Sequence, residues 1–381
     1  MAERAVSAPQ PTAGLLRADQ ILTTHQLASP RCIGCGAAGA PHLGETQSLR
    51  VADGVVRDVR VRRCTPCQQQ HTAPTDHRHA GLYADVRDWL ERYRLHPDPE
   101  TYLAHGYLDL CLRAWPGADG LPLQLATQWA VWMWRADDAF DTDLLVADPK
   151  EAAGLAAALL YAVSGQGLPR EARPLAHALA ELRMQTRAVM PGFWWDRYRT
   201  ALEAWVVSAE AKLSRYVRPG RVPSLAEYLK LRPADGGMQL AAMWCELANL
   251  CVVPDWRDSL VQEMVQAFSA VGVLLNDLAA EPGDTFTAVR AVVCTEGMSV
   301  EDARAEVLQL LRAEEHRFIV RVWAVRAMAV DSASESTRPG EFRQDTRAFA
   351  ALLDRFRRAL ATWTLESSRY AGVPQCAEAA R

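Results

Sequence analysis

The sequence predicts an all-α domain of roughly 300 residues behind a small cysteine-rich module that contains a β-hairpin. Three observations lead to this fold class. From residue 82 onward, apolar residues recur at helical spacing and no strand pattern is present. Proline and glycine pairs mark the joints between these segments, for example Pro191-Gly192 and Pro219-Gly220. Residues 31–81 differ, because they hold two CxxC pairs around alternating Val and Arg residues.

The composition of the chain limits its class. The 381 residues are 49% hydrophobic, which is ample for a large core, and the net charge of −4 gives no argument for a nucleic-acid partner. The polar, Pro- and Ala-rich start lacks the apolar centre of an export signal. The most apolar stretch, Ala152–Val163, is too short to span a bilayer. We therefore expect a cytoplasmic protein with no membrane span and no nucleic-acid partner.

The N-terminal part divides into two segments. Residues 1–30 are predicted to be disordered, because they are polar and rich in Pro and Ala. Residues 31–81 are predicted to form a zinc-ribbon-like module, in which Asp53-Gly54 turns a hairpin. Two CxxC pairs that flank a hairpin are typical of a structural Zn²⁺ site, with thiolates from Cys32, Cys35, Cys64 and Cys67. The alternative is four unrelated thiols.

Residues 82–381 are predicted to form the helical domain. The segments with apolar residues at helical spacing are Ala84–Tyr93, Gln124–Phe140, Leu175–Met190, Trp194–Tyr216, Ser259–Ala280, Val300–Val330 and Thr346–Tyr370. Such a succession of long amphipathic segments with short joints is typical of a single helical bundle.

Three acidic residues stand at the end of the helix predicted over Gln124–Phe140. Asp137 and Asp141 share one helix face, and Asp138 lies beside them. Carboxylates in an apolar setting repel one another unless they are protonated, paired or bridged by a metal ion. Mg²⁺ prefers oxygen ligands and commonly joins carboxylates to substrate phosphates. The motif therefore predicts a Mg²⁺ site at the mouth of an apolar pocket, and the alternative is a solvated acidic helix end.

Three further motifs follow in the chain, each with side chains that bind metal ions or phosphate oxygens. They are Arg232 with Asp235 and Gly236, then Asn276 with Glu281 and Asp284, and finally Arg369 with Tyr370. Together with the aspartates, and in this order, they resemble the motifs of the bacterial class I terpene synthases, or terpene cyclases. The resemblance covers about residues 82–381. It implies the class I terpene synthase-like helical bundle as the fold.

The resemblance also implies roles for these residues. Asp137, Asp138 and Asp141 match the aspartate-rich metal motif, and Asn276 matches the first position of the second metal motif. Arg232, Asp235 and Gly236 match the diphosphate sensor, linker and effector, and Arg369-Tyr370 matches the C-terminal pair that binds the diphosphate. Phe140 lies inside the first motif, where an aromatic face stabilises a carbocation. The implied cofactor is a set of three Mg²⁺ ions, and a homodimer is common in such folds.

The second metal motif departs from the family pattern. Ala280 stands where the family has Ser or Thr, Gly283 where it has Lys, and Asp284 where it has Glu. Pro282 disfavours helical geometry at Glu281, so Asp284 is expected beyond the end of the helix. We therefore expect a shortened or remodelled second metal site, with Glu281 or Asp284 as the second acid.

The function implied by the resemblance is a Mg²⁺-dependent lyase reaction. The enzyme would ionise an acyclic prenyl diphosphate, farnesyl or geranylgeranyl, release diphosphate, and cyclise the cation to a terpene hydrocarbon or alcohol. One alternative is a chain-elongating prenyl diphosphate synthase, although that family carries a second DDxxD motif, which the Asn276 region lacks. Another is a catalytically silent helical scaffold, with the zinc ribbon as the interaction module.

Overall fold

The helical domain and one β-hairpin are described by a computed structural model. It describes residues 80–142, 146–169, 171–253, 255–280, 284, 286–327 and 346–370, together with the backbone of 42–50 and 56–64. Within these residues every element after the hairpin is helical, so the prediction of an all-α domain is confirmed for them.

The elements follow in chain order. They are β1 (His42–Arg50), β2 (Val56–Cys64), α3 (Ala80–Arg92), α4 (Pro99–Leu103), α5 (Tyr107–Ala114), α6 (Gly120–Phe140), α8 (Pro149–Ser164), α9 (Pro174–Val189), α10 (Gly192–Lys212), the π-helical turn η3 (Leu213–Val217), α11 (Leu225–Asp235), α12 (Met238–Asn249), α13 (Ser259–Ala279), α14 (Ala288–Glu296), α15 (Val300–Ala327), α16 (Thr346–Glu366) and the 3₁₀ turn η4 (Ser368–Tyr370).

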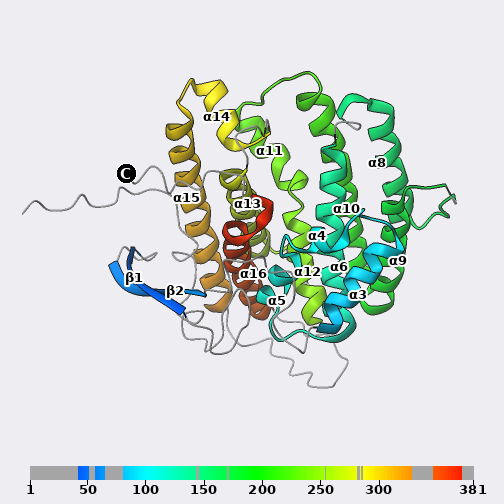
Figure 1. Ribbon diagram of the computed structural model, residues 1–381, viewed down its shortest axis with the longest axis horizontal. Coiled ribbons are helices and arrows are strands. Elements are labelled where there is room, and N and C mark those ends of the chain that lie inside the picture. Colours follow the sequence, from blue (N-terminus) through cyan, green and yellow to red (C-terminus); the bar gives the residue numbers. More distant parts are fainter. Residues whose placement is uncertain are drawn as a thin grey trace, which may run out of the picture.

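Helix α6 is surrounded by other helices. It packs against α3, α5, α9, α10 and α12, while α13 packs against α15 and α16 on another side of the bundle. Figure 1 shows α8 and α9 at one edge of the molecule and α15 at the opposite edge. Since α6 is covered all round, its middle carries buried side chains on every face, among them Trp129, Val131 and Trp132.

Two helix ends decide where the functional side chains lie. Helix α11 begins at a capping box formed by Ser224 and Glu227, which fixes its first turn. The helix ends at Asp235 and is followed by Gly236 and by Gly237, whose left-handed backbone (φ 63°) turns the chain into α12 (Met238–Asn249). Helix α13 ends at Ala279, because the backbone of Ala280 is already extended (ψ 150°). The sequence prediction that Asp284 lies beyond this helix is therefore confirmed.

Strands β1 and β2 pair antiparallel, with His42 opposite Cys64 and Arg50 opposite Val56. They cover the segment in which the hairpin was predicted. Residues 1–30, predicted to be disordered, lie outside the described residues, as do Cys32, Cys35 and Cys67. Only the backbone position of Cys64 is described, so the zinc site stays a prediction. Among the helices that the structure describes, none has a stretch long and apolar enough to cross a bilayer.

Candidate active site

Three helices bring their C-terminal ends into one region, and Lys212 of α10 lies beside them. Asp137 and Asp138 lie in the last turn of α6. Arg232 lies in the last turn of α11, and Asn276 in that of α13. The C-terminal end of a helix carries a partial negative charge, so three such ends together favour cations between them.

The aspartate-rich motif is held by cationic side chains. An Arg369 guanidinium nitrogen lies 2.6 Å from Asp138 Oδ1, and Lys212 Nζ lies 2.9 Å from Asp141 Oδ1. Burial raises the pKa of Asp137 to about 7; Lys212 counteracts this rise, and Asp141 adds to it. A carboxyl group with a raised pKa is costly to ionise unless further positive charge comes close.

Arg232 connects α11 to α13. Its guanidinium donates to Asp235 Oδ2 at 2.8 Å and to Asn276 Oδ1 at 2.7 Å, and it lies 3.4 Å from Asp277 Oδ1. Burial raises the pKa of Asp277. The charge of Arg232 opposes this rise, as do the hydrogen bonds that Tyr228 Oη and the Ala288 backbone N–H donate to the Asp277 carboxylate. Arg232 is thus fixed by three polar groups, with its orientation set before any substrate binds.

The C-terminal turn η4 closes the network. Arg369 donates to Tyr107 Oη at 3.1 Å as well as to Asp138, and Asn276 Nδ2 donates to Tyr370 Oη at 2.8 Å. Direct contacts therefore join the first metal motif, the second metal motif, the sensor and the Arg-Tyr pair. These residues lie far apart in the sequence and were predicted from separate motifs; their catalytic roles stay predictions.

The remaining predicted residues lie around this network. Asp284 follows α13 and accepts a hydrogen bond from the Phe286 backbone at 3.0 Å, while Glu281 lies outside the described residues. Gly236 is packed so closely that an added Cβ would lie 2.3 Å from Val273 Cγ1. The effector position thus requires glycine for steric reasons.

An aromatic group adjoins the charged end of α6. Trp134 lies 5.1 Å from Tyr107, 5.2 Å from Trp363 and 6.4 Å from Trp244, measured between ring centroids. Trp363 in turn meets Tyr370 edge to face at 5.6 Å. Such a wall offers several ring faces close to Asp138 and Arg369, which fits a pocket for a cation.

Phe140 lies elsewhere than predicted from its place in the motif. It is fully buried and packs edge to face against Trp205 of α10 at 5.9 Å. Its ring therefore lies in the core between α6 and α10. Residue 134 points from a different side of the helix than residue 140 does. Trp134 is therefore the aromatic residue of α6 that is better placed beside Arg369 and Tyr370.

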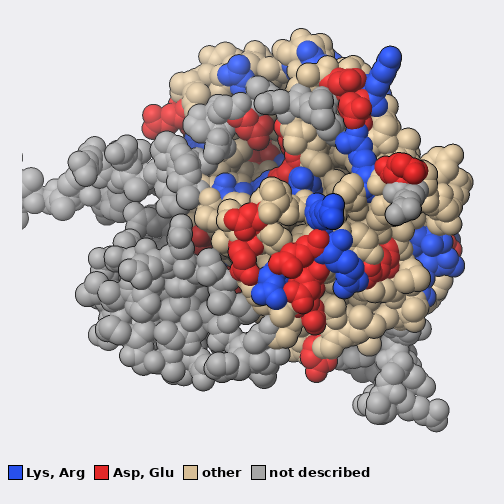
Figure 2. Space-filling view, turned by 45° about the vertical axis from the view of Figure 1, so that its right-hand side comes forward, with Lys and Arg blue, Asp and Glu red and all other residues tan. Residues whose placement is uncertain are grey.

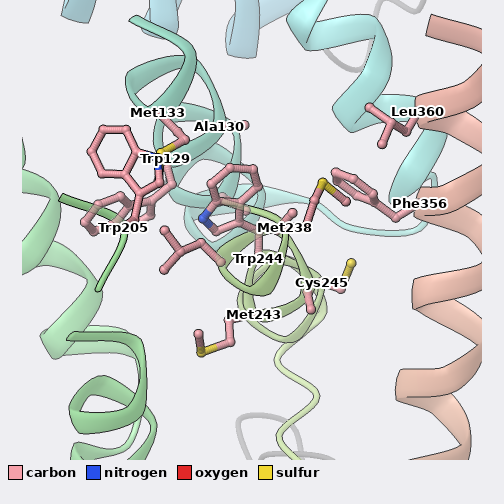
Figure 3. Packing of buried hydrophobic residues seen from close by; sticks show 14 of the residues in the cluster. Trp129, Ala130, Met133, Trp205, Met238, Met243, Trp244, Cys245, Phe356 and Leu360 are labelled. Carbon is pink, nitrogen blue, oxygen red and sulfur yellow. The ribbon is translucent and has the colours of Figure 1, made fainter. Parts of the chain in front are cut away.

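An apolar layer lies beneath the charged end. Figure 3 shows Trp129 and Met133 of α6 and Trp205 of α10 together, with Trp244 on α12 and Phe356 and Leu360 of α16 across from them. In the space-filling view, acidic and basic side chains gather in and around a hollow on one face of the molecule (Figure 2). The helical domain thus combines charged groups with a large aromatic and Met-rich interior.

The donor set fits divalent metal ions held jointly with another ligand. Carboxylate and amide oxygens of Asp137, Asp138, Asp141 and Asn276 are the atoms that Mg²⁺ prefers. Among the described residues, however, no three His, Cys, Asp or Glu side chains are already arranged to hold a metal ion. In this arrangement Arg369, Lys212 and Arg232 contact three of the four oxygen donors.

Sequence reasoning missed Lys212, Asp277, Tyr228 and Tyr107. Asp277 directly follows Asn276, so its position beside a predicted ligand was a usable signal. Lys212 ends a helical segment on the stripe of buried Trp205 and Ala209, and a lysine on such a stripe needs a buried partner.

Comparisons with known proteins agree with this architecture. Residues 128–317 match the family model "Terpene synthase family 2, C-terminal metal binding". The chain is 31% identical to the pentalenene synthase of Streptomyces arenae over 187 residues, which are 48% of this chain and 54% of that protein. It is 25% identical over 217 residues to a protein of Roseiflexus castenholzii named "(+)-T-muurolol synthase ((2E,6E)-farnesyl diphosphate cyclizing)", covering 55% of this chain and 66% of that one.

A solved structure resembles the fold over a longer range. The linalool/nerolidol synthase of Streptomyces clavuligerus superposes with a TM-score of 0.62 at 19% identity, covering 78% of this chain and 97% of that protein. The sequence matches are shorter. This chain spans 54% of the length of the S. arenae synthase, little more than half.

Proposed function

From the match of residues 128–317 to the terpene synthase family model, we propose that this chain is a terpene synthase, which ionises an acyclic prenyl diphosphate and cyclises the resulting allylic cation. Diphosphate is released, and the product is a terpene hydrocarbon or alcohol. We propose farnesyl diphosphate as the first substrate to test, because the name of the Roseiflexus relative specifies it; geranylgeranyl diphosphate is the second.

The observation that carries this proposal is the contact network between four motifs. Arg232, Arg369 and Tyr370 meet the aspartate motif and Asn276 within hydrogen-bond distance. Guanidinium groups bind phosphate oxygens by charge-assisted, often bidentate hydrogen bonds, and a tyrosine hydroxyl adds a neutral donor. The cluster is therefore suited to a diphosphate more than to a single carboxylate.

Asp137, Asp138, Asp141 and Asn276 would hold Mg²⁺. When bound, the ions offset the negative charge that develops on the leaving diphosphate. The protein itself orients the diphosphate through Arg232 and Arg369, which are already fixed by carboxylates. The aromatic wall of Tyr107, Trp134 and Trp363 would face the allylic cation, with an attraction of about 1–2 kcal/mol per desolvated ring.

The decisive experiment is product analysis. Purified full-length chain is incubated with Mg²⁺ and the geranyl, farnesyl or geranylgeranyl diphosphate, and extracts are analysed by gas chromatography. Cyclic terpenes with stoichiometric diphosphate release are expected. Diphosphate release with no terpene product from any of the three would refute the cyclase proposal. Adding isopentenyl diphosphate tests the elongating alternative, which predicts a longer prenyl diphosphate.

The silent-scaffold alternative is tested in the same assay. It predicts no turnover by the wild-type chain and no change on Asp137→Asn. The intact ion pairs of Arg232 and Arg369 favour the enzyme over the scaffold, because nothing in a purely structural role requires these groups to converge on one another.

We also propose a structural Zn²⁺ on Cys32, Cys35, Cys64 and Cys67. The pairing of β1 with β2 supports it, because the hairpin brings the segment after the first CxxC pair beside Cys64. Metal analysis of the reduced full-length chain should find one zinc per chain, and substantially less would contradict the site. Sedimentation equilibrium tests the homodimer that the resemblance implies.

A further inference from the structure

Lys212 is a buried cation that no motif accounts for. Its side chain is 6% exposed, and Nζ lies 2.9 Å from Asp141 Oδ1 and 3.8 Å from Asp235 Oδ1. It is the last residue of α10, and the helix continues beyond it as the π-helical turn η3. A buried lysine persists only where carboxylates compensate its charge.

The two carboxylates belong to different parts of the candidate site. Asp141 ends the aspartate-rich motif, and Asp235 is the acid that holds Arg232 at 2.8 Å through its other oxygen. Asp235 Oδ1 is buried and accepts no hydrogen bond from the described residues, and the Lys212 ammonium group lies 3.8 Å from it. Lys212 therefore links the first metal motif to the diphosphate sensor.

The position of Lys212 also bears on metal binding by the acids around it. Asp137, Asp141 and Asp235 all interact electrostatically with this one ammonium group. Three carboxylates close together attract a divalent cation, but a fixed positive charge among them repels it. Among the described residues, no three acidic side chains are arranged to hold a metal ion.

We propose that Lys212 is an internal counter-ion that prevents these aspartates from binding a divalent cation alone, so that metal binding depends on diphosphate. This inference rests on the proposed function. Lys212 is a positioning residue: it contacts the aspartate motif and the linker acid, and it acts on the metal and diphosphate through them. Diphosphate supplies the extra oxygen ligands and negative charge that outweigh the repulsion of the ammonium group.

The test is calorimetric titration of Mg²⁺ and Mn²⁺ into full-length protein, with and without inorganic pyrophosphate. Wild-type protein should bind the metal weakly alone and more tightly with pyrophosphate. Lys212→Met should bind the metal alone roughly tenfold tighter or more, because the repulsive charge is gone. The gain from pyrophosphate should shrink accordingly. Equal metal affinity of wild type and Lys212→Met without pyrophosphate would overturn the proposal.

Two control variants separate charge from shape. Lys212→Arg keeps the positive charge and should retain the dependence on pyrophosphate; if it behaves as Lys212→Met does, the proposal fails. Lys230→Met removes an exposed lysine of α11 and should change neither titration. Should circular dichroism show Lys212→Met to be unfolded, Lys212→Gln removes the charge while keeping a hydrogen-bond donor, and the same comparison decides.

Failure of this inference and failure of the proposed function give different results. Both titrations measure binding of ions and inorganic pyrophosphate, with no turnover involved. If the enzyme forms cyclic products and its metal affinity is the same in wild type and Lys212→Met, only the proposed counter-ion role of Lys212 is refuted. Conversely, if metal binding depends on pyrophosphate in wild type and loses this dependence in Lys212→Met, while the chain forms no terpene, only the proposed cyclase activity is refuted.

Discussion

Replacing Asp137 by Asn should stabilise the metal-free protein while removing its activity. Burial raises the pKa of Asp137 from 3.8 to about 7, so the folded protein holds this proton more tightly than the unfolded chain does. The stabilisation from the protonated carboxyl is complete below pH 3.8 and is lost as the pH rises through about 7. At pH 8 the ionised group therefore destabilises the fold, and the neutral amide does not.

The size of the effect follows from the pKa shift. A rise of about 3 units corresponds to roughly 4 kcal/mol over the complete titration, at about 1.4 kcal/mol per unit. Solvent reaches part of the side chain, and the interval from pH 5 to pH 8 covers only part of the titration. We therefore expect the free energy of unfolding of wild type to fall by about 2 kcal/mol more than that of Asp137→Asn over this interval.

The assay is urea denaturation of both proteins at pH 5 and pH 8, with the metal removed by a chelator. Asp196→Asn, at an exposed acid of α10, is the control and should follow wild type. Parallel pH dependence in wild type and Asp137→Asn would refute the reasoning. With Mg²⁺ and pyrophosphate present, the order should reverse, because only the wild-type carboxylate can bind the metal ion.

Three further changes test other parts of the structure. Gly236→Ala should destabilise the fold by about 1–3 kcal/mol, because its Cβ would lie 2.3 Å from Val273 Cγ1, and Val273→Ala should restore most of the melting temperature. Trp134→Leu should raise the ratio of open-chain alcohols to cyclic products by roughly tenfold, since loss of a cation–π contact lets water capture the cation; an unchanged product ratio would remove this ring from the pocket. Replacing Cys32 and Cys35 by Ser should lower the zinc content measured by mass spectrometry from one per chain to almost none, and unchanged zinc would contradict the predicted ligand set.

Much of the helical framework could be predicted from the sequence, because apolar periodicity reports directly on which helix face is buried. The segment predicted over Ser259–Ala280 differs by one residue from α13, which ends at Ala279. The sequence indicated that end, because Pro282 disfavours helical geometry at the residue before it and Gly283 follows. The segment predicted over Trp194–Tyr216 was less exact, since α10 passes into a π-helical turn after Lys212, and such turns leave no periodic signal.

The candidate site was predictable only where residue types carry a known pattern. Asp138 and Arg369 were each chosen from a motif, but their 2.6 Å contact depends on how η4 docks against α6. Lys212 escaped notice because its partners come from other elements: its place on a buried stripe signals that it needs a buried partner, but not which acid that partner is. The role of Phe140 stays a prediction: the structure shows its ring buried against Trp205, and membership in a motif does not tell which way a ring points at a helix end.

The charge balance of the site favours a diphosphate that enters together with divalent cations. Five carboxyl groups meet three fixed cations there: Asp137, Asp138, Asp141, Asp235 and Asp277 on one side, and Lys212, Arg232 and Arg369 on the other. The C-terminal ends of α6, α11 and α13 add partial negative charge to the same region. A diphosphate alone would add further negative charge, whereas a diphosphate that arrives with divalent cations reverses the sign. With the second motif around Asn276 altered, we propose that the aspartates at the end of α6 are the main anionic ligands and that Lys212 is the charge that decides when they bind.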